Sequence, residues 1–220
     1  MADAAYRRPA DVPTGWVSAE TEEKRSRFIA CAARVTDEDA TRDFLASVRA
    51  SYPDARHHCS AYIQHVDAAN PVERSSDDGE PAGTAGQPML EMLRGTGLQD
   101  IAAVVVRYFG GVKLGTGGLV RAYQDATRAV LKVLPVVTRQ PRELWTVDLD
   151  HAVAGKVEAE VRGRGVDVTA DYGASVTLTL SMPPGEDPTA LISELTGGGV
   201  EPGRAGMRWA DSSPTVGALR

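Results

Sequence analysis

The most informative stretch of this chain is Ile101–Tyr123, which reads IAAVVVRYFGGVKLGTGGLVRAY. Its first six residues are all apolar and four of them are β-branched, which predicts a buried strand. Five glycines then fall within nine positions, and from Leu119 to Leu134 apolar residues recur at the spacing of one helix face. A strand, a glycine-rich loop and a helix together present backbone N–H groups to an anion such as phosphate.

This glycine loop matches neither of two common nucleotide-binding motifs. A Walker A motif needs Gly-x4-Gly-Lys-Ser/Thr, but Lys113 precedes Gly115, and the dinucleotide-binding fingerprint needs a small residue where Val120 stands. One interpretation is that the glycines only allow tight turns and close packing of strand and helix. The other is a phosphate site, because cationic side chains lie near the loop. The predicted site residues are Arg107, Lys113, Gly115, Gly117, Gly118 and Arg121, with Arg56 and His58 as weaker candidates.

A second dense block, DDGEPAGTAG, begins at Asp77 and places three carboxylates in a loop rich in glycine and proline. Asp77, Asp78 and Glu80 could contact a partner or bind a hard cation, although their spacing is not that of an EF-hand. Acidic residues beside Gly and Pro also form turns through hydrogen bonds from backbone to side chain. A third interpretation is that they pair with Arg107 or Arg121 and hold the two blocks together. We favour the structural roles.

The triplet His57-His58-Cys59 suggests zinc binding or a nucleophilic thiol. On a strand, His57 and Cys59 share one face and His58 lies on the other, so one face offers two ligands, with Cys31 as a candidate third. The closely spaced pairs typical of structural zinc, such as Cys-x2-Cys, are missing. We therefore expect packed cysteines, no metal, no cofactor and no catalytic residues.

Prolines and glycines divide the 220 residues into segments. We expect a poorly ordered lead (1–15), an N-terminal domain (16–135), a linker (136–141), a C-terminal domain (142–202) and a disordered tail (203–220). Within the C-terminal domain, the hydrophobic patterns alternate as strand, helix, strand, strand, helix and strand. This βαββαβ order is typical of a ferredoxin-like fold.

The N-terminal domain shows fewer regular elements. Strands are expected over 28–35, 58–66 and 101–106, and helices over 40–52, 89–93 and 119–134. Residues 67–86 are expected to form a loop because Asp, Asn, Pro and Gly dominate them.

The composition is that of an ordinary globular protein, with 42% hydrophobic and 25% charged residues. The net charge of −6 is uneven: residues 1–140 hold 17 basic against 18 acidic side chains, and residues 141–220 hold 7 against 12. This balance counts against wholesale coating of nucleic acid, though not against a local basic patch. With two cysteines and no long apolar segment, we expect a reduced, cytoplasmic protein without a membrane partner.

Four motifs resemble those of the IMPACT family, and within it the bacterial YigZ-like proteins. These motifs are SRFIA (26–30), HHCSAY (57–62), SDDGEPAGTAGQP (76–88) and RYFGGVKLGTGGLVRAY (107–123). The resemblance implies an α+β fold with two domains. The N-terminal domain would resemble a small-subunit ribosomal protein and domain IV of elongation factor G. The C-terminal ferredoxin-like domain would be similar to domain V of that factor.

Eukaryotic members of this family are translation regulators, so we expect a non-enzymatic, cytoplasmic regulator of translation that binds the ribosome or structured RNA. A translation-factor protein is a further candidate partner, and no sequence specificity for DNA is expected. The rival is an enzyme or a binder of phosphorylated metabolites that uses the Asp77–Glu80 loop opposite the glycine loop. A third hypothesis is that the chain is a protein-interaction module. A pocket containing Asp78, Glu80, Lys113 and Arg121 would favour the rival, and an open basic face would favour RNA.

Overall fold

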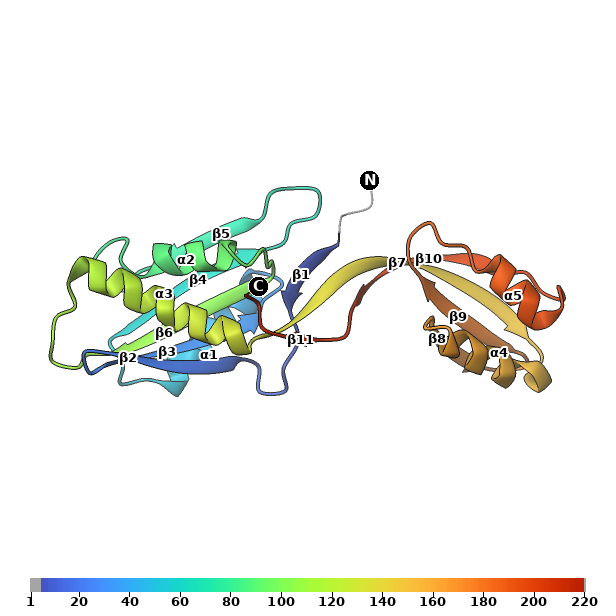
Figure 1. The fold of residues 1–220 in the computed structure, drawn as a ribbon, viewed down its shortest axis with the longest axis horizontal. Helices are drawn as coiled ribbons and strands as arrows, with labels where there is room; N and C mark the ends of the chain where they lie inside the picture. Colours follow the sequence, from blue (N-terminus) through green and yellow to red (C-terminus); the bar gives the residue numbers. More distant parts are fainter. Residues whose placement is uncertain (1–4, 220) are drawn as a thin grey trace. The chain divides into compact units, whose positions relative to one another are not determined.

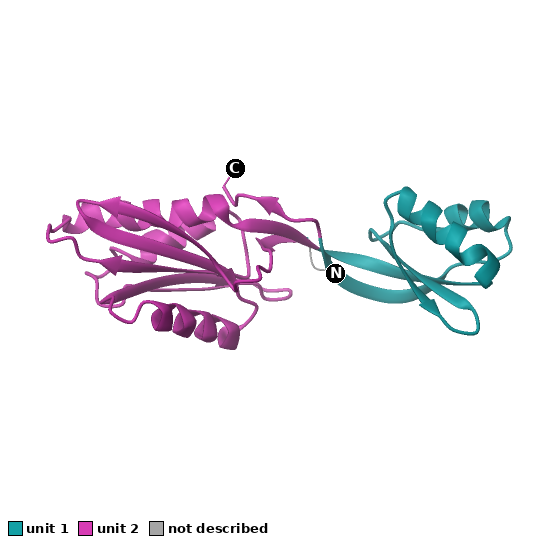
Figure 2. Cartoon of the chain, turned by 90° about the horizontal axis from the view of Figure 1, so that it is seen from below, with its two compact units in different colours: residues 1–5, 140–211 teal, residues 6–139, 212–220 magenta. Residues whose placement is uncertain are grey.

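A computed structural model describes residues 5–219 of the chain, which form two compact units (Figures 1 and 2). The large unit comprises residues 6–139 and 212–220, and the small unit comprises residues 1–5 and 140–211. The large unit is therefore made of two segments that are separated in the sequence by most of the small unit.

The large unit is built on one antiparallel sheet with the strand order β2-β3-β6-β4-β5. Its strands are β2 (Val17–Glu23), β3 (Ser26–Arg34), β4 (His57–Gln64), β5 (Val72–Ser76) and β6 (Ile101–Tyr108). Its helices are α1 (Glu38–Ser51), α2 (Gly86–Arg94) and α3 (Gly115–Val133). Helices α2 and α3 cover one face of the sheet, and α1 covers the other (Figure 1).

Strand β6 lies at the centre of this sheet because its side chains are apolar on both faces. Ile101 and Val105 pack with α2 and α3, whereas Val104 and Val106 pack with α1. A strand covered on both faces has a continuous apolar sequence. At its end β6 carries Arg107 to the edge of the core, where the glycine loop and α3 begin.

The small unit has the ferredoxin-like arrangement. Its elements are β7 (Pro135–Leu149), of which residues 140–149 belong to this unit, α4 (His151–Gly163), β8 (Asp167–Tyr172), β9 (Val176–Met182), α5 (Thr189–Thr196) and β10 (Gly203–Asp211). The strand order is β10-β7-β9-β8, in which the first and third strands of the βαββαβ unit lie at the centre. Apolar side chains such as Leu178, Leu180 and Ile192 form its separate core.

The two ends of the chain differ from the predictions. Within the expected lead, β1 (Tyr6–Pro9) pairs with β7, while residues 1–4 lie outside the described residues. The expected linker 136–141 is part of β7 itself. The expected disordered tail contains β10 and β11 (Thr215–Val216), both of which pair with β7. Pairing with a long strand satisfies the backbone groups of segments whose composition resembles that of a loop.

Two strands of the large unit were also missed. Strand β5 lies within residues 67–86, where only a loop was expected, and β2 was not predicted at all. Both are edge strands of the sheet and are rich in Glu, Ser and Arg. Because an edge strand buries little apolar surface, pairing with its neighbour stabilises it without a clear hydrophobic pattern.

Candidate functional site

A cavity of about 700 Å³ opens in the large unit, where the last residue of β6, the first turns of α3 and the start of β4 meet. Its lining combines positive, negative and apolar side chains with the backbone of the glycine loop. The lining residues are Asp54, Arg56, His57, Glu80, Pro81, Arg107, Tyr108, Phe109, Lys113, Leu114, Gly115, Thr116 and Leu119. The acidic block and the glycine loop therefore share one concave site.

Arg107 is the buried cation of this site, with 8% of the residue exposed. Its Nη1 donates a 2.6 Å hydrogen bond to Glu80 Oε1, and its guanidinium carbon lies 5.6 Å and 5.8 Å from the ring centroids of Phe28 and Phe109. Its Nε is buried and has no hydrogen-bond partner among the described residues. A buried guanidinium that uses so few of its five donors keeps donor capacity for a ligand.

Glu80 joins the cavity to the core of the large unit. Its Oε1 accepts hydrogen bonds from Arg107 and from the hydroxyl of Tyr123 at 2.8 Å, and that hydroxyl accepts a 3.3 Å hydrogen bond from the thiol of Cys59. Burial, followed by the nearby Cys59 and Glu80, raises the pKa of Tyr123. Glu80 therefore pairs with the glycine-loop segment, one of the roles considered for the acidic block.

Asp77 organises its own loop and does not line the cavity. Its Oδ1 accepts hydrogen bonds from the amides of Ala85 (3.0 Å) and Gly86 (2.8 Å), and its Oδ2 accepts one from Gly83 (2.8 Å). Burial alone would raise the pKa of Asp77, but these three hydrogen bonds lower it overall. The side chain thus ties the loop to the first turn of α2, a structural role.

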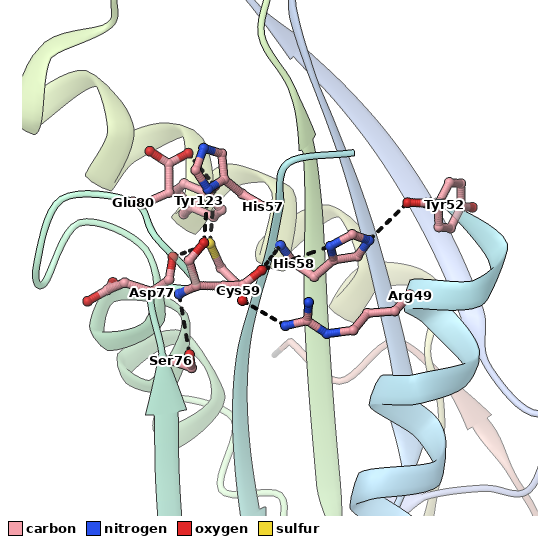
Figure 3. A network of polar contacts seen from close by, with 10 residues as sticks. Arg49, Tyr52, His57, His58, Cys59, Ser76, Asp77, Glu80 and Tyr123 are labelled. Atoms are coloured by element: carbon pink, nitrogen blue, oxygen red, sulfur yellow. Dashed lines mark hydrogen bonds and ion pairs between the residues drawn. The ribbon is translucent and has the colours of Figure 1, made fainter. Parts of the chain in front are cut away.

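Asp78 does not line the cavity either, and pairs instead with Arg49 of α1, which Figure 3 shows beside His58. It accepts hydrogen bonds of 2.7 Å from Arg49 Nη2 and from the backbone amide of His58. Burial opposes ionisation of Asp78, but these contacts lower its pKa overall. The His58 ring lies 3.1 Å from the carbonyl of Tyr52, and burial lowers its pKa. His58 and Asp78 are therefore excluded from the cavity.

His57 lines the cavity in place of His58. Its Nδ1 lies 2.9 Å from the carbonyl oxygen of Asp78, which can only accept, so Nδ1 carries the hydrogen. In the neutral ring, Nε2 is then the hydrogen-bond acceptor. The period-two alternation of a strand already separates His57 from His58, but it does not say which face borders the glycine loop.

The predicted phosphate-binding residues divide between two hollows. Arg56, Lys113 and Gly115 line the main cavity with Arg107, and neither Arg56 nor Lys113 forms an ion pair with another described residue. Arg121 instead lines a smaller hollow of about 140 Å³ on the other side of α3. That hollow also contains Lys24, Asp125 and Gly118. The remaining predicted residue, Gly117, lines neither hollow.

The first turn of α3 is suited to an anion at the cavity mouth. No side chain caps this end of the helix, and no acidic residue stands in its first turn. Helix starts carry free N–H groups and a partial positive charge. Gly115 and Thr116 bring this end of α3 to the cavity, beside Lys113.

The cysteines form neither a metal site nor a disulfide. Cys31 packs with the α1 face of the sheet and Cys59 with the opposite face, and both are free thiols. Burial raises the pKa of Cys31 to about 11 and that of Cys59 to about 12, the opposite of an activated nucleophile. Among residues 5–219, no group of three His, Cys, Asp or Glu side chains could hold a metal ion. No helix in the same range is long and apolar enough to span a membrane.

Comparison with known proteins places this site in a family. Residues 24–131 match the family model of the Impact N-terminal domain. The IMPACT family member YigZ of Escherichia coli is 41% identical over 173 residues, which cover 78% of this chain and 85% of that protein. The chain belongs to the IMPACT family. All residues that line the cavity fall within the stretch that matches the IMPACT domain.

Two further comparisons concern a solved structure and a eukaryotic relative. A crystal structure described as that of a hypothetical protein is 36% identical, covers 92% of this chain and 97% of its own, and has a TM-score of 0.59. The "Protein IMPACT homolog" of Saccharomyces cerevisiae is 30% identical over 131 residues, which cover 56% of this chain and 50% of that protein. The two-domain α+β fold is thus shared with a solved structure, and the family extends to eukaryotes.

Proposed function

We propose that this IMPACT family protein regulates translation by binding ribosomal or other structured RNA, and that its cavity holds an RNA phosphate. The observation that carries the proposal is the convergence of Arg56, Arg107 and Lys113 with the uncapped start of α3 in one cavity. Charged and backbone donors of this kind bind phosphate oxygens. No acidic side chain in the first turn of α3 competes with such a ligand.

The charge distribution of the large unit also supports an anionic partner. Residues 101–140 contain six basic side chains (Arg107, Lys113, Arg121, Arg128, Lys132 and Arg139) and one acidic side chain, Asp125. The whole chain nevertheless carries a net charge of −6. A basic segment in an acidic protein attracts an anion to that segment more than to the rest of the chain.

Membership of the family supports a role in translation, but it does not identify RNA as the ligand. The eukaryotic members that the motifs resemble are translation regulators, and the yeast relative matches more than half of this chain. RNA as the target comes from the chemistry of the cavity and not from the family, so a direct test must separate it from other phosphate-bearing ligands.

The second candidate function is binding of a phosphorylated metabolite. The observation that favours it is the cavity itself, because about 700 Å³ lies within the range of small-molecule sites. The arrangement expected of such a site is only partly present, since Glu80 and Lys113 line the cavity but Asp78 and Arg121 do not. Thermal-shift screening of phosphorylated metabolites against the wild type addresses this candidate.

The main experiment is co-sedimentation with ribosomes from a cell extract at low and high salt. We compare the wild type with Lys113→Glu, and use Lys132→Glu as the matched control, because Lys132 is an exposed lysine near the far end of α3. We expect co-sedimentation at low salt that weakens as salt rises, is lost in Lys113→Glu and persists in Lys132→Glu. Wild-type protein that stays in the supernatant at low salt, or equal losses in the two variants, would contradict the proposal.

A further inference from the structure

The cavity is larger and more apolar than a phosphate group requires. Beside the cationic residues, its walls include Pro81, Phe109, Leu114 and Leu119. Apolar walls next to charged donors fit a ligand that has both a phosphate and a flat hydrophobic part. The backbone of a duplex offers only the phosphate and sugar at such a site, because its bases are stacked and paired.

Phe109 supplies an exposed aromatic surface in this lining. It is 59% exposed, and the guanidinium carbon of Arg107 lies 5.8 Å from the centroid of its ring. The neighbouring Tyr108 ring is held by a 2.8 Å hydrogen bond from its hydroxyl to Asp54. An exposed aromatic ring beside a guanidinium is a surface on which an unstacked base can lie.

His57 adds a ring-nitrogen acceptor to a cavity whose two carboxylates, Asp54 and Glu80, already accept hydrogen bonds from other side chains. Because Nδ1 donates to the carbonyl of Asp78, Nε2 of the neutral ring can accept. A phosphate offers no hydrogen to such an acceptor once it is ionised, whereas the ribose 2′-hydroxyl does. This hydroxyl is the group by which proteins distinguish RNA from DNA.

Arg107 provides the independent sign that the cavity has a ligand. Its side chain is more than nine-tenths buried, lines the cavity, and makes one hydrogen bond among the described residues, to Glu80. Buried polar groups in native proteins normally find partners, so the unpaired Nε and the remaining donors call for one. A phosphate near Lys113 and the start of α3 would supply acceptors to the other guanidinium donors of Arg107, which lines the cavity.

From these contacts we infer that the cavity binds one unpaired ribonucleotide, with its phosphate at Lys113 and α3, its 2′-hydroxyl at His57 and its base on Phe109. This inference rests on the proposed function, which makes RNA the source of the bound nucleotide. The same chemistry is present in a free ribonucleoside 5′-phosphate, and the experiment below distinguishes the two sources.

The test measures fluorescence anisotropy with three labelled probes of one sequence: single-stranded RNA, single-stranded DNA and duplex RNA. We expect the single-stranded RNA to bind tightest, about five-fold more tightly than the DNA. Phe109→Ala should weaken RNA binding about ten-fold. Tyr172→Ala, which removes a similarly exposed ring (63%) from the small unit, should have no effect.

His57→Ala should bring RNA binding down to the DNA level while DNA binding stays unchanged, and His151→Ala, in the small unit, should preserve the difference. Circular dichroism must show each variant to be folded. Equal binding of duplex and single-stranded RNA, or no effect of Phe109→Ala, would overturn the inference while ribosome co-sedimentation still supports the proposed function. A free 5′-mononucleotide mixture that competes as well as the RNA oligonucleotide would confirm the ribonucleotide site and overturn RNA as its source. Absence of binding by every probe and by the mononucleotides would overturn the inference.

Discussion

Gly110 lies directly against the backbone of Arg25. A Cβ atom built on Gly110 would stand 2.0 Å from the carbonyl carbon of Arg25 and 2.4 Å from the amide nitrogen of Ser26. The amide of Gly110 also donates a 3.1 Å hydrogen bond to the Ser26 hydroxyl. Only glycine fits there, so the first glycine of the loop fixes it to the turn between β2 and β3.

We therefore expect Gly110→Ala to destabilise the large unit by about 2–3 kcal/mol, because the methyl group must displace backbone and not a flexible side chain. The matched control is Gly117→Ala in the first turn of α3, where the nearest atom is Arg121 Nη1 at 3.7 Å. Urea unfolding followed by circular dichroism gives both free energies. Equal stability of the two variants would show that the loop moves away from Arg25 without cost.

The buried pair of Glu80 and Arg107 predicts strong coupling between the two residues. Glu80→Ala leaves the guanidinium buried without its carboxylate and should cost about 3–5 kcal/mol. Tyr123→Phe removes the hydroxyl that donates to Glu80 and accepts from Cys59, and should cost about 1–2 kcal/mol. The double variant Glu80→Leu/Arg107→Met should be more stable than Glu80→Ala. Additive losses in a double-mutant cycle of Glu80→Ala and Arg107→Ala would contradict the pairing.

The role of Asp77 in its loop can be tested by measuring stability at acid pH. Its pKa is lower in the folded protein than its ordinary value of 3.8, so its contribution is present above that value and is lost as pH falls. Asp77→Asn should cost about 2 kcal/mol at pH 7, because the amide cannot accept all three hydrogen bonds. The stability of this variant should also fall less steeply toward low pH than that of the wild type. Asp43→Asn, on the exposed side of α1, is the control, and equal slopes for all three proteins would exclude the role.

The two buried thiols predict that the stability of the fold decreases at alkaline pH. The pKa values of Cys31 (about 11) and Cys59 (about 12) lie above the ordinary value of 9.0, so the folded state holds both protons more tightly. Their stabilising contribution is complete below about pH 9 and is lost as pH rises toward these values. At pH 8 both thiols should react slowly with Ellman's reagent until urea is added. Rapid labelling of the native protein would show that one thiol is accessible and acidic.

The residues after the small unit predict a cost of truncation. Ala218 is 1% exposed, and its amide donates a 2.8 Å hydrogen bond to the carbonyl of Leu131 on α3. Deletion of residues 212–220 should destabilise the large unit by about 2–4 kcal/mol. Val216→Ala, at a position that is 80% exposed, should change stability by less than about 0.5 kcal/mol. Unchanged stability after the deletion would mean that the segment is dispensable for folding.

Much of the fold follows from hydrophobic spacing. The apolar run from Ile101 predicts β6, and the repeat from Leu119 predicts α3. The order of patterns after residue 142 predicts the ferredoxin-like sheet, although its last strand, β10, lies in the segment expected to be a disordered tail. Strands β1, β2, β5 and β11 could not be predicted in this way. They are stabilised by pairing with other strands, and their own sequences do not indicate which strand each one pairs with.

The candidate site was predicted less completely than the fold. The sequence places Arg107 and Lys113 on either side of the first glycines of the loop, and both line the cavity. It cannot say that Arg121, two helical turns after Lys113, lines a different hollow. His57 and not the predicted His58 lines the cavity, because the packing of α1 and α3 decides which face of β4 meets the loop.

The division of the large unit into two segments sets the order in which it can be completed during synthesis. Residues 6–139 leave the ribosome first, but the position that Ala218 fills beside α3 stays open until the whole small unit has been made. Part of the core of the nascent large unit therefore stays uncovered until then. The small unit has a separate core and can already fold. Closure of the large unit thus requires that translation has passed Ala218.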